Sequence, residues 1–171
     1  MALAAEIEPF ILERSLAAPR ALVWACFTDG RHLARWWGPK GCSVEVKRLD
    51  LVPGGVFHYS FRYGATPPMW GRFVFREITP PERLVFVNSF SDPDGGLTRA
   101  PFDGTWPIEM LSTITFAEDG DGTRVTVHWL PIDPTETERA TFDAGRASMA
   151  QGWGGSFEVL EGYLREIVPR T

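Results

Sequence analysis

The pattern of apolar and polar positions divides the 171-residue chain into short segments of strand or helix periodicity. Ile7–Ser15 alternates imperfectly between apolar and charged side chains, which predicts a half-exposed strand. A short apolar helix is expected over residues 19–27, because Pro19 suits a first helical turn. A second helix is expected over Arg31–Trp37, with Asp29 as its N-cap. The chain therefore begins with one strand and two short helices.

Six further segments are rich in β-branched and aromatic residues and predict strands. They are Ser43–Leu51, Val56–Tyr63, Met69–Ile78, Arg83–Phe90, Ile108–Phe116 and Thr123–Leu130. Turns containing Pro or Gly separate them, which favours an antiparallel meander and gives seven strands in all. The longer connection Ser91–Pro107 is rich in Pro and Gly and is expected to be irregular, either a mobile rim or a functional lid.

The spacing of apolar residues becomes helical from Asp133 to about Val168 and predicts one long C-terminal helix. The order strand, two helices, six strands, helix indicates an α+β domain that spans residues 1–171, with a core over about 7–168. Six consecutive antiparallel strands must curl, and one helix cannot cover their whole concave face. The space between sheet and helix is either filled by large side chains or left as a ligand pocket.

Alternation along the strands selects the side chains that face this space. The candidate cavity residues are Phe57, Tyr59, Phe61, Phe86, Asn88, Met110, Trp129, Met149 and Trp153. Asn88 and Ser112 stand out as polar positions on an apolar face. They either orient a ligand or are ordinary buried polar groups, with the asparagine paired to the backbone.

Four glycines within the predicted C-terminal helix call for a structural reason, because each costs about 0.8–1 kcal/mol relative to alanine. They are Gly145, Gly152, Gly154 and Gly155. Either the helix approaches the sheet closely at these positions, or they leave room for a ligand beside Met149 and Trp153.

Composition and charge exclude several classes of protein. The net charge is −5 and no basic stripe follows the chain, which disfavours nucleic acid as a partner. Apolar stretches are too short to cross a bilayer and the first residues lack a basic signal-peptide region, so we expect no membrane association and a cytoplasmic location. Cys26 and Cys42 are expected to be buried thiols rather than a disulfide.

Catalytic and metal-binding patterns are not evident in the sequence. His58 and His128 fall on the outward parity of their strands, and His32 has no neighbouring ligand at metal spacing. There is neither a Gly-x-Ser-x-Gly elbow nor a phosphate-binding glycine loop. We therefore expect no metal and no cofactor, and a binding role is favoured over catalysis, although an acid–base site needs only one such side chain and a water.

Several motifs taken together resemble the activator of heat-shock protein 90 ATPase homologue-like family. They are Ala18-Pro19-Arg20-Ala21-Leu22-Val23-Trp24, Leu33-Ala34-Arg35-Trp36-Trp37-Gly38-Pro39, Asp50-Leu51-Val52-Pro53-Gly54-Gly55, Pro80-Pro81-Glu82-Arg83-Leu84-Val85, Gly122-Thr123-Arg124-Val125-Thr126-Val127, and Gly152-Trp153 with Leu160. The resemblance covers nearly the whole chain. It implies the helix-grip fold (START-like or SRPBCC, Bet v-type), in which a curved antiparallel sheet wraps around a long C-terminal helix. Trp129 stands where relatives often carry a polar residue, and its indole would reduce any pocket.

The resemblance implies a cavity function more than a reaction, because its motifs are mostly architectural. The first hypothesis is a protein that binds a small apolar or aromatic molecule. The second is an enzyme of the polyketide cyclase or aromatase type that uses the same cavity. The third is a stress-related partner of a chaperone, although the eukaryotic activators need an added N-terminal domain for which 171 residues leave no room. Homodimerisation fits all three, since an open sheet leaves edge strands to protect.

Overall fold

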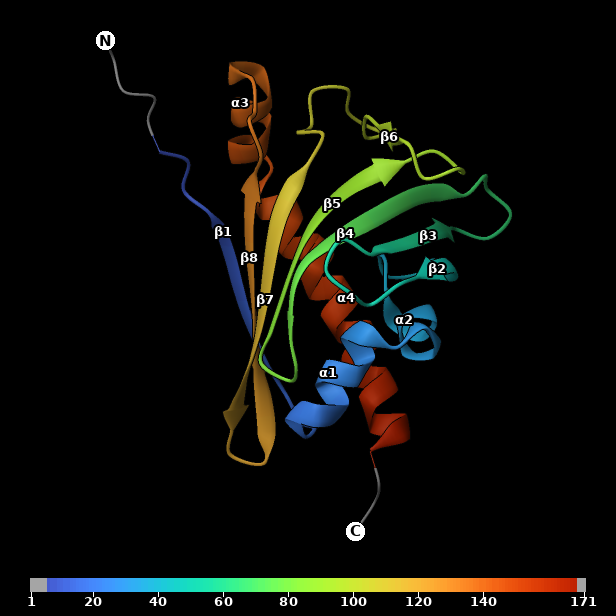
Figure 1. Cartoon of the computed structure of the whole chain (residues 1–171), viewed down its shortest axis with the longest axis vertical. Coiled ribbons are helices and arrows are strands. Elements are labelled where there is room, and N and C mark those ends of the chain that lie inside the picture. Colours follow the sequence, from blue (N-terminus) through green and yellow to red (C-terminus); the bar gives the residue numbers. More distant parts are fainter. Residues whose placement is uncertain (1–5, 169–171) are drawn as a thin grey trace.

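Within residues 6–168, the computed structural model contains eight strands and four helices (Figure 1). The strands are β1 (Phe10–Leu16), β2 (Ser43–Leu49), β3 (Val56–Arg62), β4 (Met69–Thr79), β5 (Arg83–Ser91), β6 (Leu97–Thr98), β7 (Met110–Asp119) and β8 (Gly122–Pro131). The helices are α1 (Arg20–Thr28), α2 (Gly30–Trp36), α3 (Glu136–Ala144) and α4 (Arg146–Ile167). The α+β class and the order of the main elements agree with the sequence pattern.

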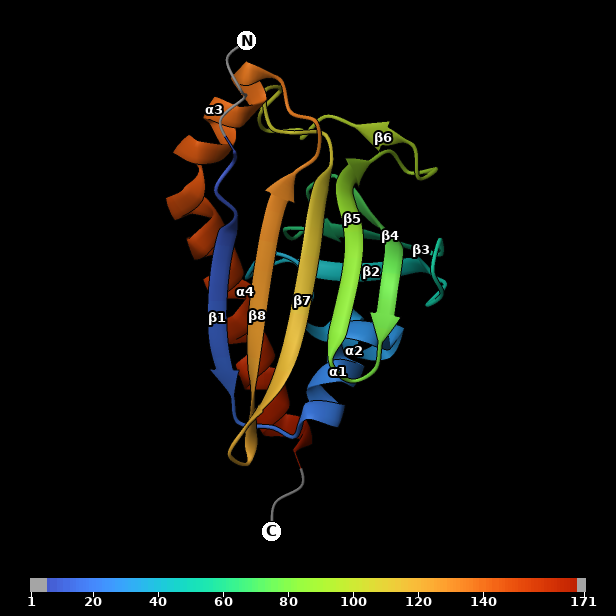
Figure 2. The ribbon, with the colours of Figure 1, turned by 60° about the vertical axis from the view of Figure 1, so that its left-hand side comes forward.

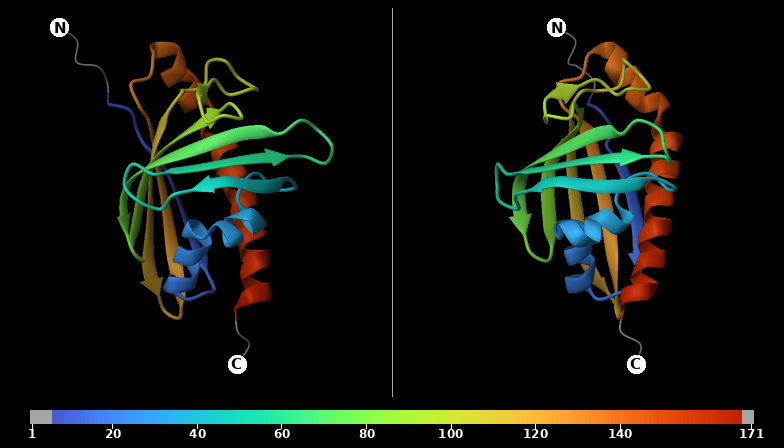
Figure 3. Two further views of the ribbon diagram at one scale, coloured as in Figure 1. Left: turned by 45° about the vertical axis from the view of Figure 1, so that its right-hand side comes forward. Right: turned by 90° about the vertical axis from the view of Figure 1, so that its right-hand side faces the viewer.

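The strands form one antiparallel sheet in the order β1-β8-β7-β5-β4-β3-β2, with the short β6 paired to β5. The sheet curls so strongly that β2 and β3 run across the direction of β7 and β8 (Figure 2). Helix α4 lies along the concave side (Figure 3). Helices α1 and α2 occupy one end of this concave space, and α3 with the β5–β7 connection occupies the other.

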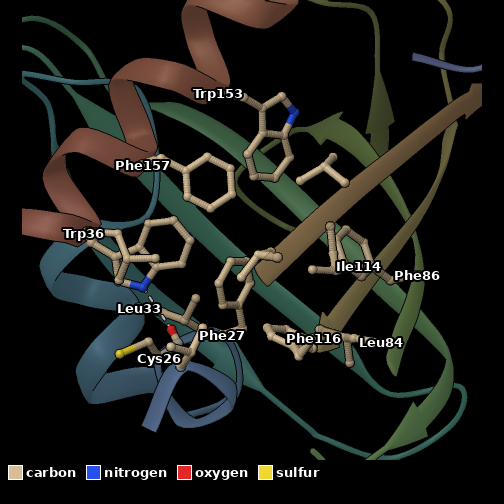
Figure 4. Close-up of a cluster of buried hydrophobic side chains, with 14 of the residues drawn as sticks. Cys26, Phe27, Leu33, Trp36, Leu84, Phe86, Ile114, Phe116, Trp153 and Phe157 are labelled. Carbon is tan, nitrogen blue, oxygen red and sulfur yellow. Dashed lines mark hydrogen bonds between the residues drawn. The ribbon is translucent and has the colours of Figure 1, made fainter. Parts of the chain in front are cut away.

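Helices α1 and α2 close their end of the sheet with large apolar side chains (Figure 4). Asp29 caps α2, because its carboxylate accepts a hydrogen bond from the Arg31 backbone N–H at 2.9 Å. The Trp36 indole N–H donates to the Cys26 carbonyl at 2.8 Å, and its ring packs edge-on against Phe27. Since Trp36, Phe27 and Phe116 are all buried, this end of the molecule is solid core.

The single C-terminal helix expected over residues 133–168 is wrong in one respect, because it is divided at Gly145. Thr135 and Glu138 form a capping box that starts α3 as a separate helix. The Trp106 ring lies against Gly145, so that a Cβ there would come within 3.2 Å of both Trp106 Cζ3 and the Thr141 carbonyl oxygen. The apolar spacing does not reveal the break because Phe142 and Met149, on either side of it, are both buried.

The strands differ from the sequence-based expectation most clearly at the start of β1 and within the β5–β7 connection. The first strand begins at Phe10 rather than Ile7. The connection expected to be wholly irregular contains β6, whose Leu97 and Thr98 pair with Ser91 and Phe90, and this raises the count from seven strands to eight. A two-residue strand is too short to produce an alternating pattern, so it left no signal in the sequence.

Candidate functional site

A cavity of about 220 Å³ lies between α4, the concave face of the sheet and the end of the β5–β7 connection. Its walls are Trp37, Gly38, Pro39, Tyr59, Phe61, Asn88, Ser89, Phe90, Trp106, Pro107, Ile108, Met110, Trp129, Met149, Gly152, Trp153 and Ser156. Strands β3, β5, β7 and β8 supply the floor, and α4 supplies the opposite wall. The site therefore brings together residues from nearly the whole length of the chain.

Seven of the nine residues expected to face this space do line the cavity. They are Tyr59, Phe61, Asn88, Met110, Trp129, Met149 and Trp153. Phe57 and Phe86 do not, and their expected place in the lining is corrected here: both are buried in the solid core. The Phe73 ring lies between them, 5.0 Å from Phe57 and 3.8 Å from Phe86 by ring centroids, and so fills the fold of the curled sheet.

Aromatic rings pack edge to face around the cavity and hold its shape. The Trp37 ring contacts Tyr59 at a centroid distance of 6.1 Å and Trp153 at 5.7 Å. Trp153 in turn contacts Trp129 at 5.5 Å. Rings from α4, β3, β8 and the turn after α2 therefore form one continuous aromatic wall.

The adjacent residues Trp36 and Trp37 lie in different places, one in the core and the other in the cavity wall. Sequence reasoning did not identify Trp37 as a cavity residue. Trp36 is buried in the core at the α1–α2 end of the sheet, whereas Trp37, Gly38 and Pro39 line the cavity. The Ser156 hydroxyl donates to the Gly38 carbonyl at 2.6 Å and so ties this turn to α4. The signal was present in the Trp-Trp-Gly-Pro motif, but no periodicity shows which of two adjacent rings faces a cavity.

Asn88 and Ser112 are neighbours on the apolar floor. The Ser112 hydroxyl donates to the Asn88 side-chain carbonyl at 2.5 Å. Ser112 is fully buried, so Asn88 supplies the acceptor that its hydroxyl needs. The Asn88 side chain is therefore paired with another side chain, not with the backbone as in the second of the two interpretations drawn from the sequence, and this pairing uses only the oxygen of the amide.

The cavity carries no charge among the residues that line it in the described part of the chain. Tyr59 is the one lining residue with an ionisable side chain. Burial raises the pKa of Tyr59 to about 12, and a hydrogen bond with the neighbouring Trp37 side chain opposes the rise. The whole lining is thus neutral at physiological pH.

The β5–β7 connection forms the outer wall of the cavity and is fastened to α3. Arg99 forms a 3.0 Å ion pair with Glu138, whose side chain is only 8% exposed. The Thr105 and Thr141 hydroxyls are 2.8 Å apart and hydrogen-bonded. Trp106 packs against Phe142 and lines the cavity. The β5–β7 connection is thus part of the cavity wall and does not only surround the cavity mouth.

A second hollow of about 270 Å³ lies beyond Phe90, which borders both spaces. It is lined by Pro68, Met69, Trp70, Phe90, Ser91, Thr98, Arg99 and Pro101. Its wall includes the charged Arg99 and no residue of α4, so it is distinct from the neutral cavity under that helix.

The histidines and cysteines lie outside the cavity lining. His32 Nδ1 is 2.6 Å from the Tyr163 hydroxyl, and His58 Nε2 is 3.2 Å from the Asp92 carbonyl. Cys26 is buried and Cys42 is half-buried, and both are free thiols whose pKa is raised by burial. Among residues 6–168, no three His, Cys, Asp or Glu side chains gather in a way that could hold a metal ion.

Comparison with known proteins assigns the chain to a family. Residues 17–165 match the activator of Hsp90 ATPase homolog 1-like proteins. The chain belongs to this family. Among curated proteins, none matches the sequence. None of the helices described in residues 6–168 combines the length and apolar character needed to cross a bilayer.

Solved structures of similar proteins show the same fold. A protein from Nitrosomonas europaea is 26% identical with a TM-score of 0.72, over 96% of this chain and 97% of that one. The AHSA1 protein from Silicibacter pomeroyi is 20% identical with a TM-score of 0.69, over 93% and 99%. The fold is thus the START-like helix grip that the motifs implied.

A more distant neighbour is DynU16, a protein in the dynemicin biosynthetic locus. It is 22% identical with a TM-score of 0.60, and the match covers 92% of this chain but 47% of DynU16. This AHSA1-like chain therefore corresponds to about half of that protein, and the likeness is one of fold.

Proposed function

We propose that the protein binds a small, uncharged aromatic or apolar molecule in the cavity between α4 and the sheet. The observation that carries the proposal is the lining itself, in which seven aromatic rings enclose a space of about 220 Å³ without a charged side chain. Burying an ion in such a space would cost its hydration with no opposite charge in return. A neutral ring system loses only unfavourable contact with water.

The size of the cavity limits the ligand to a small ring system. An engineered cavity of about 150 Å³ lined by apolar side chains binds benzene. The cavity here, at about 220 Å³, is larger by roughly half of that volume. We therefore expect one or two rings rather than four.

Binding is favoured over catalysis by the chemistry of the walls. General acid–base catalysis near neutral pH uses groups whose pKa lies near the working pH. Tyr59 is the only ionisable lining residue and its pKa lies at about 12. The family match and the fold shared with a protein of a biosynthetic locus are compatible with a carrier, or a binding component, of aromatic-metabolite chemistry.

The proposal is tested with naphthalene and 2-naphthoate, which share a ring system and differ by a carboxylate group with its negative charge. We expect naphthalene to raise the melting temperature and quench tryptophan fluorescence at a one-to-one ratio, because Trp37, Trp129 and Trp153 line the cavity. 2-Naphthoate should bind at least about tenfold more weakly.

The matched control removes an aromatic ring outside the cavity. Phe102 is 70% exposed and is absent from the cavity lining, so Phe102→Ala should leave naphthalene binding unchanged. If neither probe shifts the melting temperature, or if the naphthoate binds as tightly as naphthalene, the cavity is not a site for neutral aromatic ligands.

A further inference from the structure

One hydrogen-bond donor in the cavity is unused. Asn88 lines the cavity and its amide oxygen is occupied by Ser112. Its amide nitrogen makes no hydrogen bond to any residue of the described chain, yet it is not among the buried polar atoms that lack a partner. The nitrogen therefore retains accessible surface, and the space beside it is the cavity.

Ser112 fixes which end of the Asn88 amide is presented. The buried hydroxyl donates to the Asn88 oxygen. After a rotation of the amide by 180° the hydroxyl could only accept from the NH₂ group, and its own proton would lose the acceptor that it has among the described residues. Asn88 and Ser112 lie on adjacent strands β5 and β7, where Asn88 is paired with Met110 and Phe86 with Ser112. The backbone thus holds the amide in place, and an NH₂ group is what a ligand meets.

Two indole N–H groups of the lining residues differ from the Asn88 amide. Trp129 Nε1 and Trp153 Nε1 are both buried and have no acceptor among the described residues. Trp153 is 6% exposed, and Figure 4 shows its indole nitrogen directed away from Phe157. Both nitrogens are covered by neighbouring atoms, so of these three donors only the Asn88 NH₂ group is accessible to a ligand.

We propose that the ligand is a one- or two-ring aromatic molecule bearing a neutral hydrogen-bond acceptor, above all a ketone, aldehyde or lactone carbonyl, which accepts from the Asn88 amide. The inference rests on the proposed function, because it concerns the same cavity. A carbonyl matches an NH₂ group and carries no charge that the apolar walls would reject. A ligand that can only donate finds the Asn88 oxygen already engaged by Ser112.

Asn88 is therefore a specificity-determining residue, while Ser112 positions it. Sites built around a buried polar group discriminate against ligands that leave that group unpaired. A hydrocarbon of the same shape would still fit the rings of the wall but would leave the Asn88 donor without a partner. The structure thus predicts a preference between two ligands that differ by one oxygen.

Tetralin and 1-tetralone provide this comparison, since they share two fused rings and differ by exchange of one CH₂ for a carbonyl. Isothermal titration with the full-length protein should show 1-tetralone binding between about threefold and tenfold more tightly than tetralin, as expected for one neutral hydrogen bond. Asn88→Leu, of similar size, should abolish this preference while leaving tetralin binding within about twofold.

A second variant guards against loss of folding, because Asn88→Leu leaves the buried Ser112 hydroxyl without its acceptor. Asn88→Leu/Ser112→Ala removes both polar groups and should show the same loss of preference. Ser112→Ala alone frees the amide to turn and should reduce the preference only in part.

The outcomes separate the two proposals. The wild-type protein could bind both compounds equally, or Asn88→Leu and the double variant could weaken both compounds alike. Either result would show that Asn88 does not recognise a carbonyl, and it would overturn the further inference while the proposed function stands. If neither compound binds, the proposed function fails and the inference fails with it. If the Asn88 variants lose the preference for 1-tetralone and still bind tetralin as the wild type does, both proposals are supported.

Discussion

At the scale of single residues, the glycines of the C-terminal segment have different reasons for their presence. A Cβ at Gly145 would crowd Trp106, and one at Gly155 would come within 3.3 Å of Lys40 Cβ. A Cβ at Gly152 would meet nothing within 4 Å, although Gly152 borders the cavity. Close packing and open space, the two explanations drawn from the sequence, therefore apply to different glycines of the same segment.

The open space beside Gly152 predicts a selective effect of a larger side chain. Leucine is a better helix former than glycine by roughly 0.8 kcal/mol, so Gly152→Leu should fold at least as stably as the wild type. Its side chain would stand at the cavity border and weaken naphthalene binding by about tenfold or more, measured by fluorescence titration.

Gly162 supplies the matched control on the same helix. A Cβ there would meet only the end of Arg165, at 3.8 Å, and the position lies outside the cavity lining. Gly162→Leu should give a similar gain in stability with unchanged naphthalene affinity. Equal naphthalene affinities for the two leucine variants would show that Gly152 borders neither the binding site of the ligand nor its route of entry.

Strand alternation was sufficient to place most of the cavity residues, and its failures have a physical cause. Tyr59, Phe61, Asn88 and Met110 were found because side chains two apart share a face. Alternation names a face but not a position along it, and so it could not separate Phe57, in the packed part of the concave surface, from Tyr59 two residues further along.

At the scale of elements, α3 and the β5–β7 connection behave as one unit. Glu138 links them, because it accepts from the Thr135 backbone N–H at 3.0 Å within the capping box and pairs with Arg99 of the connection. Trp106 of the connection then reaches both Phe142 and the cavity. The start of a helix and one wall of the site thus depend on the same carboxylate.

Glu138 therefore predicts a pH-dependent contribution to stability. Hydrogen bonds from Thr135, and then Arg99, lower the pKa of Glu138 below its ordinary value of 4.5. A lowered pKa in the folded state stabilises the protein above pH 4.5, and this stabilisation is lost as the pH falls below 4.5 through the folded value. In urea unfolding, Glu138→Ala should cost about 1–2 kcal/mol at pH 7, and this cost should decrease as the pH falls below 4.5.

Glu138→Gln serves as the control for charge. Glutamine keeps an oxygen for the Thr135 N–H and loses the ion pair with Arg99, whose side chain is 47% exposed. Its cost should stay below about 1 kcal/mol, as for partly exposed pairs. A pH-independent difference between the wild type and Glu138→Ala would contradict the assigned role of the carboxylate.

The same unit explains where sequence analysis fell short at this scale. The helix break at Gly145 and the short β6 are both fixed by contacts between segments distant in sequence, Trp106 with Gly145 and Leu97 with Ser91. Local periodicity carries no information on such contacts. The longer elements were predictable because each buries a regular face of its own.

At the scale of the whole molecule, the two ends of the concave space are built differently. At the α1–α2 end, Trp36, Phe27 and Phe116 pack into solid core. At the α3 end, the aromatic rings stand around a space instead of filling it. One curled sheet and one helix therefore hold a rigid core and a cavity side by side, and the volume of the cavity depends on the largest rings in its wall.

Trp129 is the ring whose removal should change ligand size most simply. It lines the cavity from β8 and contacts Trp153 and Phe10 at centroid distances of 5.5 and 6.4 Å. Because a volume of about 220 Å³ suits one or two rings, the wild-type cavity should accept naphthalene but bind phenanthrene at least about tenfold more weakly. Trp129→Leu should reverse this order, with a loss of stability below the roughly 3–5 kcal/mol of a Trp→Ala truncation in a core.

Trp70→Leu makes the same exchange on strand β4 at a position outside the cavity lining, where the Trp70 ring packs against His58. This variant should lose stability without changing the preference for two rings over three, which separates cavity volume from general loosening. Competition between naphthalene and phenanthrene, followed by fluorescence, measures the preference directly. If the wild type binds naphthalene and phenanthrene equally, the cavity adapts to larger ligands, and Trp129 does not limit the number of rings in the ligand.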